Sequence, residues 1–526
     1  MELKLENLDQ ILEKVDKGPD YDVTKLREES IKDPKWLAFG SGNIFRGFIA
    51  RVNQDAINAG KEDRGISVVE TFDEEIIEKI YKPYDNLALS VTLHKDGNFD
   101  TNLIANLVEA LTLKDMTRIK EIAVHPNLEL MSFTITEKGY NLYGSDGNLM
   151  GVVSEDLENG PEASKHLMSI VTALLNLRYK ENGKALTLLS MDNASHNGDL
   201  VKNSVMLVAK AWLEKGFVEE GFIKYLEEKI AFPLSMIDKI TPRPAEDVQK
   251  HLEELGFSGM ETVVTEKGSY IAGFVNSEEA EYLVIEDKFT NGRPAFEEGG
   301  VYMADRDTVN KVETMKVTTC LNPLHTVLAT YGCVLGHTKI SGEMEDAELV
   351  KLIKKIGYDE GLKVVVNPGI IDPKDFIDEV INVRFPNKFM PDTPQRIATD
   401  TSQKIPVRFG QTIKGYVNDE NLDVADLKFI PLALAGWLRY LLGVNDEGEA
   451  FELSNDPMMD YLKESLEGIK VGEFKETEGL KDLLRNEKIF GVNLEEVGLS
   501  EIVTKYFEEL SAGPGSVRAT LKKYLA

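Results

Sequence analysis

Cysteine is almost absent from this chain of 526 residues. Its two cysteines, Cys320 and Cys333, can form neither a disulfide framework nor a four-thiolate zinc site. The seven histidines are scattered without a close pair, which excludes the usual catalytic zinc site. No run of about 18 apolar residues could span a bilayer, and the first residues, Met1-Glu-Leu-Lys-Leu-Glu6, are not a signal peptide. We therefore expect a cytoplasmic protein that binds no metal and does not enter a membrane.

Basic residues are also scarce, with 60 Lys and Arg against 90 Asp and Glu and a net charge of −30. This balance argues against nucleic acid or anionic lipid as a partner. An anionic substrate would need a local cluster of Arg and Lys. The length exceeds one ordinary domain, and the 42% hydrophobic content is enough for full cores. We expect an N-terminal extension over 1–34, a nucleotide-binding domain over 35–298 and a second domain over 299–526, in a monomer or small homo-oligomer.

A glycine turn follows the first apolar stretch. Residues 36–39 have the pattern of a strand, and Gly40-Ser-Gly42-Asn43-Ile44 leads into a helical pattern. Glycines there permit a tight bend and a close approach of a pyrophosphate to the helix N-terminus, so the turn predicts a dinucleotide site. The third glycine, Gly47, comes two positions late, and an ordinary strand–helix turn is the alternative.

Glu70 ends the next strand, over 65–70. A carboxylate at this position can accept hydrogen bonds from the adenosine ribose and repels a 2′-phosphate, which favours NAD over NADP. Asp73 and Glu74 follow. Their simpler interpretation is that they begin a helix over 75–81, where acids are favourable.

Strands and helices then alternate along the chain. A hairpin is expected over 87–102, a helix over 106–122, a strand over 128–136 that ends at Thr136-Glu137, a helix over 163–178, and a strand over 186–191 that leads to Asp192-Asn193. This alternation predicts a doubly wound, mostly parallel sheet, whose strand carboxyl ends form the walls of a site. A polar turn that caps the next helix is the alternative for 192–198. From about residue 300 the patterns are helical, so the fold class is an α/β Rossmann-type domain followed by a mostly α-helical domain, with the site in the cleft between them.

The segment from Lys316 to His325 places an amine, an amide and an imidazole within ten residues. Asn322 before Pro323 is a good helix start, with Asn322 as the N-cap and His325 in the first turn. Both side chains could then reach one ligand. The alternative is that Lys316 extends to water and that Asn322 is only a cap.

Basic residues recur further along the helical half, at Arg396, Lys404 and Arg408. Arginine can hold a carboxylate through two parallel hydrogen bonds, and lysine adds a point charge. This group is one way to bind an anionic substrate in an acidic protein. Surface cations with acidic neighbours are the alternative.

Several of these motifs, in this order, resemble the polyol-specific long-chain dehydrogenases. The resemblance covers residues 36–510 and rests on Gly40-Ser-Gly42-Asn43 with Arg46, Thr136-Glu137-Lys138-Gly139-Tyr140, Asp192-Asn193 with Asn197-Gly198, Asp238-Lys-Ile-Thr-Pro242, the Lys316, Asn322 and His325 segment, and Arg396 with Lys404. It implies metal-independent hydride transfer between NAD(P) and a secondary alcohol. Carried over to matching positions, it implies that Lys316 is the general acid/base and that Asn193, Asn322 and His325 surround the reacting oxygen. Asp238, Arg396 and Lys404 would bind substrate, while the cofactor would contact Gly40, Gly42, Asn43, Ile44, Glu70, Thr136 and Glu137.

The sequence departs from the family in one place. The usual spacing between the catalytic lysine and asparagine is one residue shorter than from Lys316 to Asn322, and Pro323 is not typical there. Either a bulge absorbs the extra residue, or the assignment of Lys316 is less secure than that of His325.

The amino-acid sequence of residues 316–325 and 401–408 resembles the fructuronate reductase branch of the family more than the mannitol branch. It implies a sugar-acid substrate: interconversion of D-fructuronate and D-mannonate with NADH, in hexuronate catabolism. Arg408 would join Arg396 and Lys404 on the carboxylate. Mannitol 2-dehydrogenase and tagaturonate reductase activities are the alternatives within the family, and a non-catalytic NAD-binding sensor is the alternative of another class.

Overall fold

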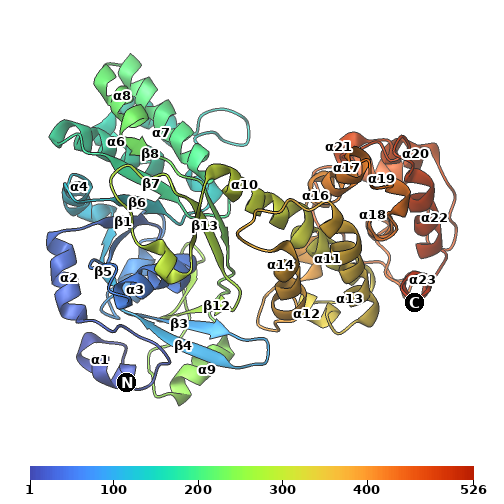
Figure 1. Cartoon of the computed structure of the whole chain (residues 1–526), viewed down its shortest axis with the longest axis horizontal. Helices are drawn as coiled ribbons and strands as arrows, with labels where there is room; N and C mark the ends of the chain where they lie inside the picture. Colours follow the sequence, from blue (N-terminus) through green and yellow to red (C-terminus); the bar gives the residue numbers. More distant parts are fainter. The chain divides into compact units, whose positions relative to one another are not determined.

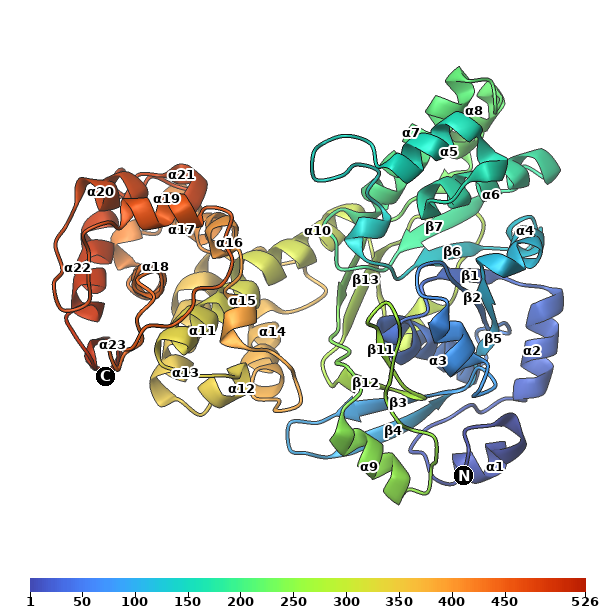
Figure 2. The ribbon, with the colours of Figure 1, turned by 180° about the vertical axis from the view of Figure 1, so that it is seen from behind.

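The computed structural model describes all 526 residues and divides into two compact units, Met1–Asn310 and Lys311–Ala526 (Figures 1 and 2). All of the strands lie in the first unit, and the second is helical. None of the helices combines the length and the hydropathy that crossing a membrane requires. The predicted fold class, a Rossmann-type domain followed by a helical one, is confirmed.

A six-stranded sheet forms the centre of the first unit. In spatial order its strands are β5 (Leu107–Thr112), β2 (Ile66–Glu70), β1 (Trp36–Phe39), β6 (Leu130–Phe133), β7 (Leu186–Ser190) and β8 (Ile230–Ala231). Every neighbouring pair is parallel. The chain starts in the middle, runs outward to one edge, and returns to build the other half, which is the doubly wound order of dinucleotide-binding domains.

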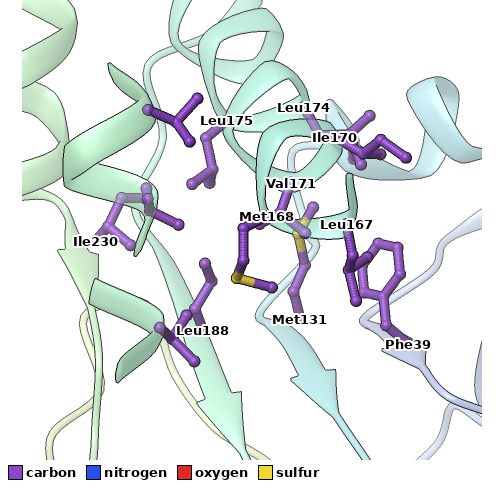
Figure 3. Packing of buried hydrophobic residues seen from close by; sticks show 14 of the residues in the cluster. Phe39, Met131, Leu167, Met168, Ile170, Val171, Leu174, Leu175, Leu188 and Ile230 are labelled. Atoms are coloured by element: carbon purple, nitrogen blue, oxygen red, sulfur yellow. The ribbon is translucent and has the colours of Figure 1, made fainter. Parts of the chain in front are cut away.

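Both faces of this sheet are buried. Successive residues of each strand point to opposite sides, so each strand contributes side chains to two hydrophobic cores. In β1, Leu37 and Phe39 belong to one hydrophobic core, and Trp36 and Ala38 belong to the other. Helix α6 (Leu167–Glu181) covers the first face, where its apolar side chains pack against Phe39, Met131 of β6 and Leu188 of β7 (Figure 3). Helix α3 (Ala50–Asn58) covers the second face (Figure 2).

The predicted helix over 106–122 is wrong in its first half. Residues Leu107–Thr112 form the edge strand β5, and only Met116–Ala123 is helical, as α4. Strand β5 pairs in parallel with β2, and the register shifts once between Ile66 and Ser67, where Val108 is left without a partner in β2. Leu107, Val108 and Leu111 are buried in this position. The spacing of these apolar residues suits a short helix as well as a strand. The segment forms a strand because it can pair with the edge of β2.

Smaller sheets complete the first unit. The predicted hairpin is confirmed as the antiparallel pair β3 and β4. The smaller sheets contain β3 (Ala88–Leu93), β4 (Phe99–Ile104) and β12 (Phe274–Glu278); β9 (Ser235–Asp238), β13 (Tyr282–Glu286) and β14 (Tyr302–Ala304); and β10 (Val263–Val264) with β11 (Tyr270–Ile271). Its other helices are α1 (Leu8–Leu12), α2 (Val23–Lys32), α5 (Gly151–Asn159), α7 (Asn197–Glu214), α8 (Glu220–Glu228) and α9 (Glu246–Glu254).

Residues 1–34, expected as an extension, belong to the first compact unit. Arg27 of α2 donates a hydrogen bond to the Asp85 carbonyl at 2.7 Å, and the Asp16 amide donates to the Thr101 carbonyl at 2.7 Å. These contacts attach the N-terminal segment to the domain.

Helix α10 (Arg306–Met315) crosses the boundary between the units, and the second unit continues from it. Its core helices are α11 (Asn322–Val334) and α18 (Phe429–Tyr440), both almost entirely buried. The others are α12 (Ile340–Glu343), α13 (Ala347–Lys354), α14 (Pro373–Glu379), α15 (Pro394–Ile397), α16 (Thr401–Arg408), α17 (Gly410–Asn418), α19 (Met459–Ser465), α20 (Glu478–Leu484), α21 (Glu487–Phe490), α22 (Ser500–Leu510) and α23 (Ser516–Tyr524).

Candidate active site

The turn after β1 has the geometry that a dinucleotide needs. Gly40 has a φ of +98°, and a Cβ at this position would collide with the carbonyl oxygen of Thr134. Only glycine therefore fits between β1 and the end of β6. A Cβ on Gly42, by contrast, would meet nothing within 4 Å, so the backbone there is open to a ligand. These residues fit the pyrophosphate of a nicotinamide cofactor at the start of the following helix, together with Asn43 and Ile44, which are half-buried.

Glu70 lies beside this turn at the end of β2, and it is buried. One carboxylate oxygen accepts hydrogen bonds from the Ser41 amide at 3.0 Å and the Ser41 hydroxyl at 2.6 Å. The other accepts from the amides of Phe72 at 2.9 Å and Asp73 at 3.1 Å. The side chain thus ties the glycine turn to the end of β2. Ribose binding by Glu70 remains a prediction. The carboxylate already accepts four hydrogen bonds from within the protein.

The carboxyl ends of β6 and β7 bring two further predicted segments together. Thr136 and Glu137 are exposed just beyond β6, and Asn193 is exposed just beyond β7. Asp192 connects the two segments. Its side chain is buried and accepts hydrogen bonds from the Ile135 amide at 3.0 Å and from the Tyr140 hydroxyl. Burial raises the pKa of Asp192 to about 7. The sequence motifs included Asp192 and Tyr140 but gave neither a role.

Asp238 is the last residue of β9 and is buried. The next side chain, Lys239, is also buried. Its ammonium group donates to the Glu278 carbonyl at 2.5 Å and to a Glu281 carboxylate oxygen at 2.9 Å. Burial lowers the pKa of Lys239. The ion pair between Lys239 and Glu281 therefore fixes the backbone just after β9. The substrate role of Asp238 stays a prediction.

In the second unit, Lys316 begins a π-helical turn, Lys316–Cys320, that joins α10 to α11. The Leu321 amide donates to the Lys316 carbonyl at 3.1 Å, five residues back. A π turn holds one residue more than an α turn and is usually a local insertion into a helix. The π turn offers a place for the extra residue between Lys316 and Asn322, as the first of the two alternatives requires. The catalytic role of Lys316 stays a prediction. Lys316 is buried there.

Asn322 is not the N-cap of α11, which corrects the sequence prediction by one residue. Leu321 occupies the cap position, and no side chain makes a capping hydrogen bond. The reason is the π turn, because it carries the helical path almost directly into α11. Asn322 is instead the first helical residue, with Pro323 behind it and its amide group half-buried.

His325 lies in the first turn of α11, as predicted. Its ring packs against Phe385 with centroids 5.1 Å apart, and its Nε2 is buried without a hydrogen-bond partner. The nearest carboxylate oxygen, on Asp392, is 3.6 Å away. Burial lowers the pKa of His325 to about 4. The Asp392 carboxylate opposes this shift, and the nearby guanidinium groups of Arg408, Arg396 and Arg384 add to it. The imidazole is therefore neutral at physiological pH and offers an unpaired nitrogen.

The three predicted substrate cations gather around this end of α11. Arg408 donates to the Thr326 hydroxyl at 2.5 Å and to the Asn322 carbonyl at 3.3 Å, and burial lowers its pKa to about 10. The Lys404 ammonium donates to the carbonyls of Ile397, at 3.0 Å, and Thr399. Burial lowers its pKa to about 8, and the nearby Arg408 adds to that shift.

Arg396 differs from the other two because its side chain is 61% exposed while it pairs with the buried carboxylate of Asp392. The structure brings Arg396, Lys404, Arg408 and His325 together. It also adds Arg384, Phe385 and Asp392, which the sequence did not single out as site residues. The recurrence of basic residues from Arg384 onward is the one signal that could have found them.

No group of three or more His, Cys, Asp or Glu side chains is arranged to hold a metal ion. The first unit carries a glycine turn suited to a dinucleotide, and the second carries the predicted Lys, Asn and His set. The chain belongs to the mannitol dehydrogenase family: the mannitol dehydrogenase Rossmann domain matches residues 34–298, and the mannitol dehydrogenase C-terminal domain matches residues 308–511.

Its relatives include the D-mannonate oxidoreductase of Thermotoga maritima, which is 51% identical over 96% of this chain and 95% of that protein. Among solved structures, a D-sorbitol dehydrogenase is 25% identical with a TM-score of 0.79, covering 96% of this chain and 97% of that one. The mannitol 2-dehydrogenase of Pseudomonas fluorescens, in complex with NAD and D-mannitol, is 23% identical with a TM-score of 0.71, covering 100% and 99% of the two chains. This last likeness shows the shared fold.

Proposed function

We propose that this oxidoreductase interconverts D-fructuronate and D-mannonate with NAD(H) and without a metal ion. The observation that carries this proposal is the 51% identity, over nearly the whole chain, to a D-mannonate oxidoreductase. The cations Arg396, Lys404 and Arg408 support it, because a sugar acid needs local positive charge in a protein with thirty excess negative charges. We further infer that the enzyme works in the cytoplasm, since its two cysteines are buried and unpaired.

Each predicted catalytic residue takes the role that the family resemblance implies. When bound, NADH supplies the hydride to the carbonyl carbon of D-fructuronate. The buried ammonium of Lys316 gives its proton to the carbonyl oxygen, which becomes the hydroxyl of D-mannonate, and accepts it back in the reverse direction. Asn193, Asn322 and the neutral His325 donate hydrogen bonds to the oxygen while negative charge develops on it.

The cofactor residues fit the same reaction. The open backbone at Gly42, with Gly40, Asn43 and Ile44 around the turn, holds the pyrophosphate. Glu70 favours NAD over NADP through its charge beside the ribose, and the exposed Thr136 and Glu137 line the cofactor beyond β6. Asp238 binds a substrate hydroxyl group, and the three cations bind the carboxylate.

Substitution of the acid/base separates catalysis from binding. Lys316→Ala is expected to abolish NADH oxidation by D-fructuronate, while NADH binding, followed by fluorescence, stays near that of the wild type. Lys355→Ala is the control, because Lys355 is an exposed lysine of the same unit that pairs with Asp359 and lies near the Phe429 ring, and it has no role in the proposed reaction. Loss of both activity and NADH binding in Lys316→Ala would contradict the acid/base assignment.

Two activities within the family compete with this proposal, namely those of mannitol 2-dehydrogenase and tagaturonate reductase. They would use the same catalytic residues. D-Fructose lacks the carboxylate that the cations would hold, whereas D-tagaturonate carries it and differs from D-fructuronate in the configuration of one hydroxyl group. A non-catalytic NAD sensor is the alternative of another class, and the complete set of Lys316, Asn322 and His325 argues against it, because a sensor has no use for proton transfer.

A further inference from the structure

A hydrogen-bonded network joins the carboxyl ends of β6 and β7 to the start of β9 in the first unit. The Ser235 hydroxyl of β9 donates to the Ser190 carbonyl of β7 at 2.6 Å. Asn197, at the start of α7, donates to the Ser235 hydroxyl at 2.9 Å and to the Asp192 carbonyl at 3.0 Å. The side-chain oxygen of Asn197 accepts a hydrogen bond from the backbone N–H of Ser235 at 3.0 Å. All of these side chains are buried, so the network fixes the backbone on both sides of the β7 end.

Tyr140 and Asp192 extend this network to β6. The Tyr140 hydroxyl donates to the Asp192 carboxylate, and the Ser190 hydroxyl lies 2.8 Å from the same phenol oxygen. The Ile135 amide donates to the same Asp192 oxygen at 3.0 Å. The Tyr140 carbonyl accepts from Ser204 of α7 at 2.8 Å. Tyr140 is 1% exposed, so its hydroxyl group is shielded from bulk solvent and relies on these protein partners.

The positions of these two residues in the chain connect the network to the reaction. Asp192 immediately precedes Asn193, which hydrogen-bonds the reacting oxygen in the proposed function. Ile135 immediately precedes Thr136 and Glu137, which line the cofactor. One carboxylate oxygen of Asp192 therefore fixes the segment on the cofactor side, while its backbone leads into the catalytic amide.

A buried carboxylate is a costly way to fill this space if packing is the only requirement. No basic side chain pairs with it. Its neighbours from the adjoining elements are the phenol of Tyr140 after β6, the hydroxyl of Ser190 in β7, the uncharged Asn197 of α7 and Ser235 of β9. An apolar pair would pack as densely, but it would not fix the Ile135 amide and the β7 end at the same point.

We propose that Tyr140 and Asp192 are positioning residues for hydride transfer, which act by holding Asn193 and the Thr136–Glu137 segment in register across the ends of β6 and β7. This inference rests on the proposed function, because it assigns the network an effect through Asn193. A displacement of the catalytic amide by a fraction of an ångström lowers kcat more than it lowers substrate binding.

A double-mutant cycle with Asn193 tests the inference in the full-length enzyme, with D-fructuronate and NADH as substrates. Tyr140→Phe removes only the hydroxyl and is expected to lower kcat roughly 10- to 100-fold, with the KM for D-fructuronate changed less than about threefold. In the Asn193→Ala background the same substitution is expected to lower kcat by less than about threefold, because its effect passes through Asn193.

Tyr225→Phe is the matched control. Tyr225 is a buried tyrosine of the same unit whose hydroxyl donates to the Lys184 carbonyl at 2.8 Å, away from the β6 and β7 carboxyl ends. It is expected to leave kcat unchanged. If Tyr140→Phe does not fold, as judged by its melting temperature, Asp192→Asn replaces it in the cycle, since its amide has the shape of the carboxylate but lacks the charge.

The failures of the inference and of the proposed function give different results. The positioning role alone would be overturned by either of two results. In the first, the loss of kcat in Tyr140→Phe is fully additive with that of Asn193→Ala. In the second, Tyr140→Phe changes kcat no more than Tyr225→Phe does. Wild-type turnover in Asn193→Ala would overturn the catalytic assignment of Asn193 and the inference with it.

Discussion

At the scale of single residues, His325 shows most clearly how the fold sets the chemistry. Its ring is buried beside Phe385 and several cations, so protonation would add a charge where hydration is poor and positive charge is already present. The imidazole is therefore held neutral, with Nε2 unpaired. A neutral imidazole can donate a hydrogen bond to an oxygen that gains charge, and it would not compete with Lys316 as the acid of the proposed reaction.

The lowered pKa of His325 has a consequence for stability. The unfolded chain binds a proton on this residue below about pH 6.5, and the folded protein binds it only below about pH 4. Because the folded pKa lies below the unfolded one, acid favours unfolding through this group, and its stability contribution is lost as pH falls from 6.5 to 4. Relative to His325→Gln, the wild type should lose about 3 kcal/mol of unfolding free energy between pH 7 and pH 4.

Urea unfolding of both proteins at the two pH values measures this difference. Equal losses in wild type and His325→Gln would show that the imidazole is not held neutral by the fold.

Arg396 is the most exposed of the three cations, so it is the one whose replacement should disturb the fold least. Arg396→Ala should raise the KM for D-fructuronate roughly 10- to 100-fold, the value of one lost charge-assisted hydrogen bond, and should leave the KM for D-fructose nearly unchanged. Arg485→Ala serves as the control, because Arg485 is also exposed and paired with an acid, Glu495, in the same unit. Steady-state kinetics in which both KM values rise together would remove the carboxylate contact.

At the scale of elements, the glycine turn offers a matched pair of substitutions. Gly40→Ala places a methyl group against the Thr134 carbonyl at a φ of +98° and should destabilise the protein by more than about 2 kcal/mol. Gly42→Ala meets no protein atom within 4 Å, so its melting temperature should stay near that of the wild type. Its methyl group would occupy the space for the pyrophosphate, and the Kd for NADH should rise at least about tenfold.

Thermal melting and NADH titration of the two variants separate these effects. Wild-type NADH affinity in Gly42→Ala would mean that the dinucleotide does not approach the backbone at this turn.

The elements also show what a sequence can and cannot predict. Four strands of the central sheet, β1, β2, β6 and β7, were predictable because runs such as Leu186–Ser190 are largely apolar on both faces, as buried parallel strands must be. The strand Leu107–Thr112 was not, because its apolar spacing also suits a helix and the deciding partner, Ile66–Glu70, lies some forty residues earlier in the chain. The π turn at Lys316–Cys320 leaves no trace in local composition; only the departure from the family spacing indicated it.

The candidate site was predictable as a set of residues but not as a set of contacts. Motifs named Glu70, Arg408 and Asp192, yet nothing local to them indicates that Ser41, Thr326 and Tyr140 are their partners. These contacts join segments that are far apart in sequence, and they decide which polar groups are already satisfied within the protein.

At the scale of the whole molecule, the proposed function divides the work between the two units in the way that the mannitol dehydrogenase family implies. The first unit supplies a doubly wound sheet with the dinucleotide turn, and the second supplies Lys316, Asn322, His325 and the cations. The strong negative charge of the chain makes those cations informative, since positive charge is kept where a sugar acid would need it.

The most direct test of this account is NADH oxidation, followed by absorbance, with D-fructuronate, D-tagaturonate and D-fructose side by side, each with and without EDTA. We expect the highest kcat/KM with D-fructuronate and no change on addition of EDTA. Preference for D-fructose would contradict the carboxylate role of Arg396, Lys404 and Arg408, and loss of activity in EDTA would contradict the metal-independent mechanism.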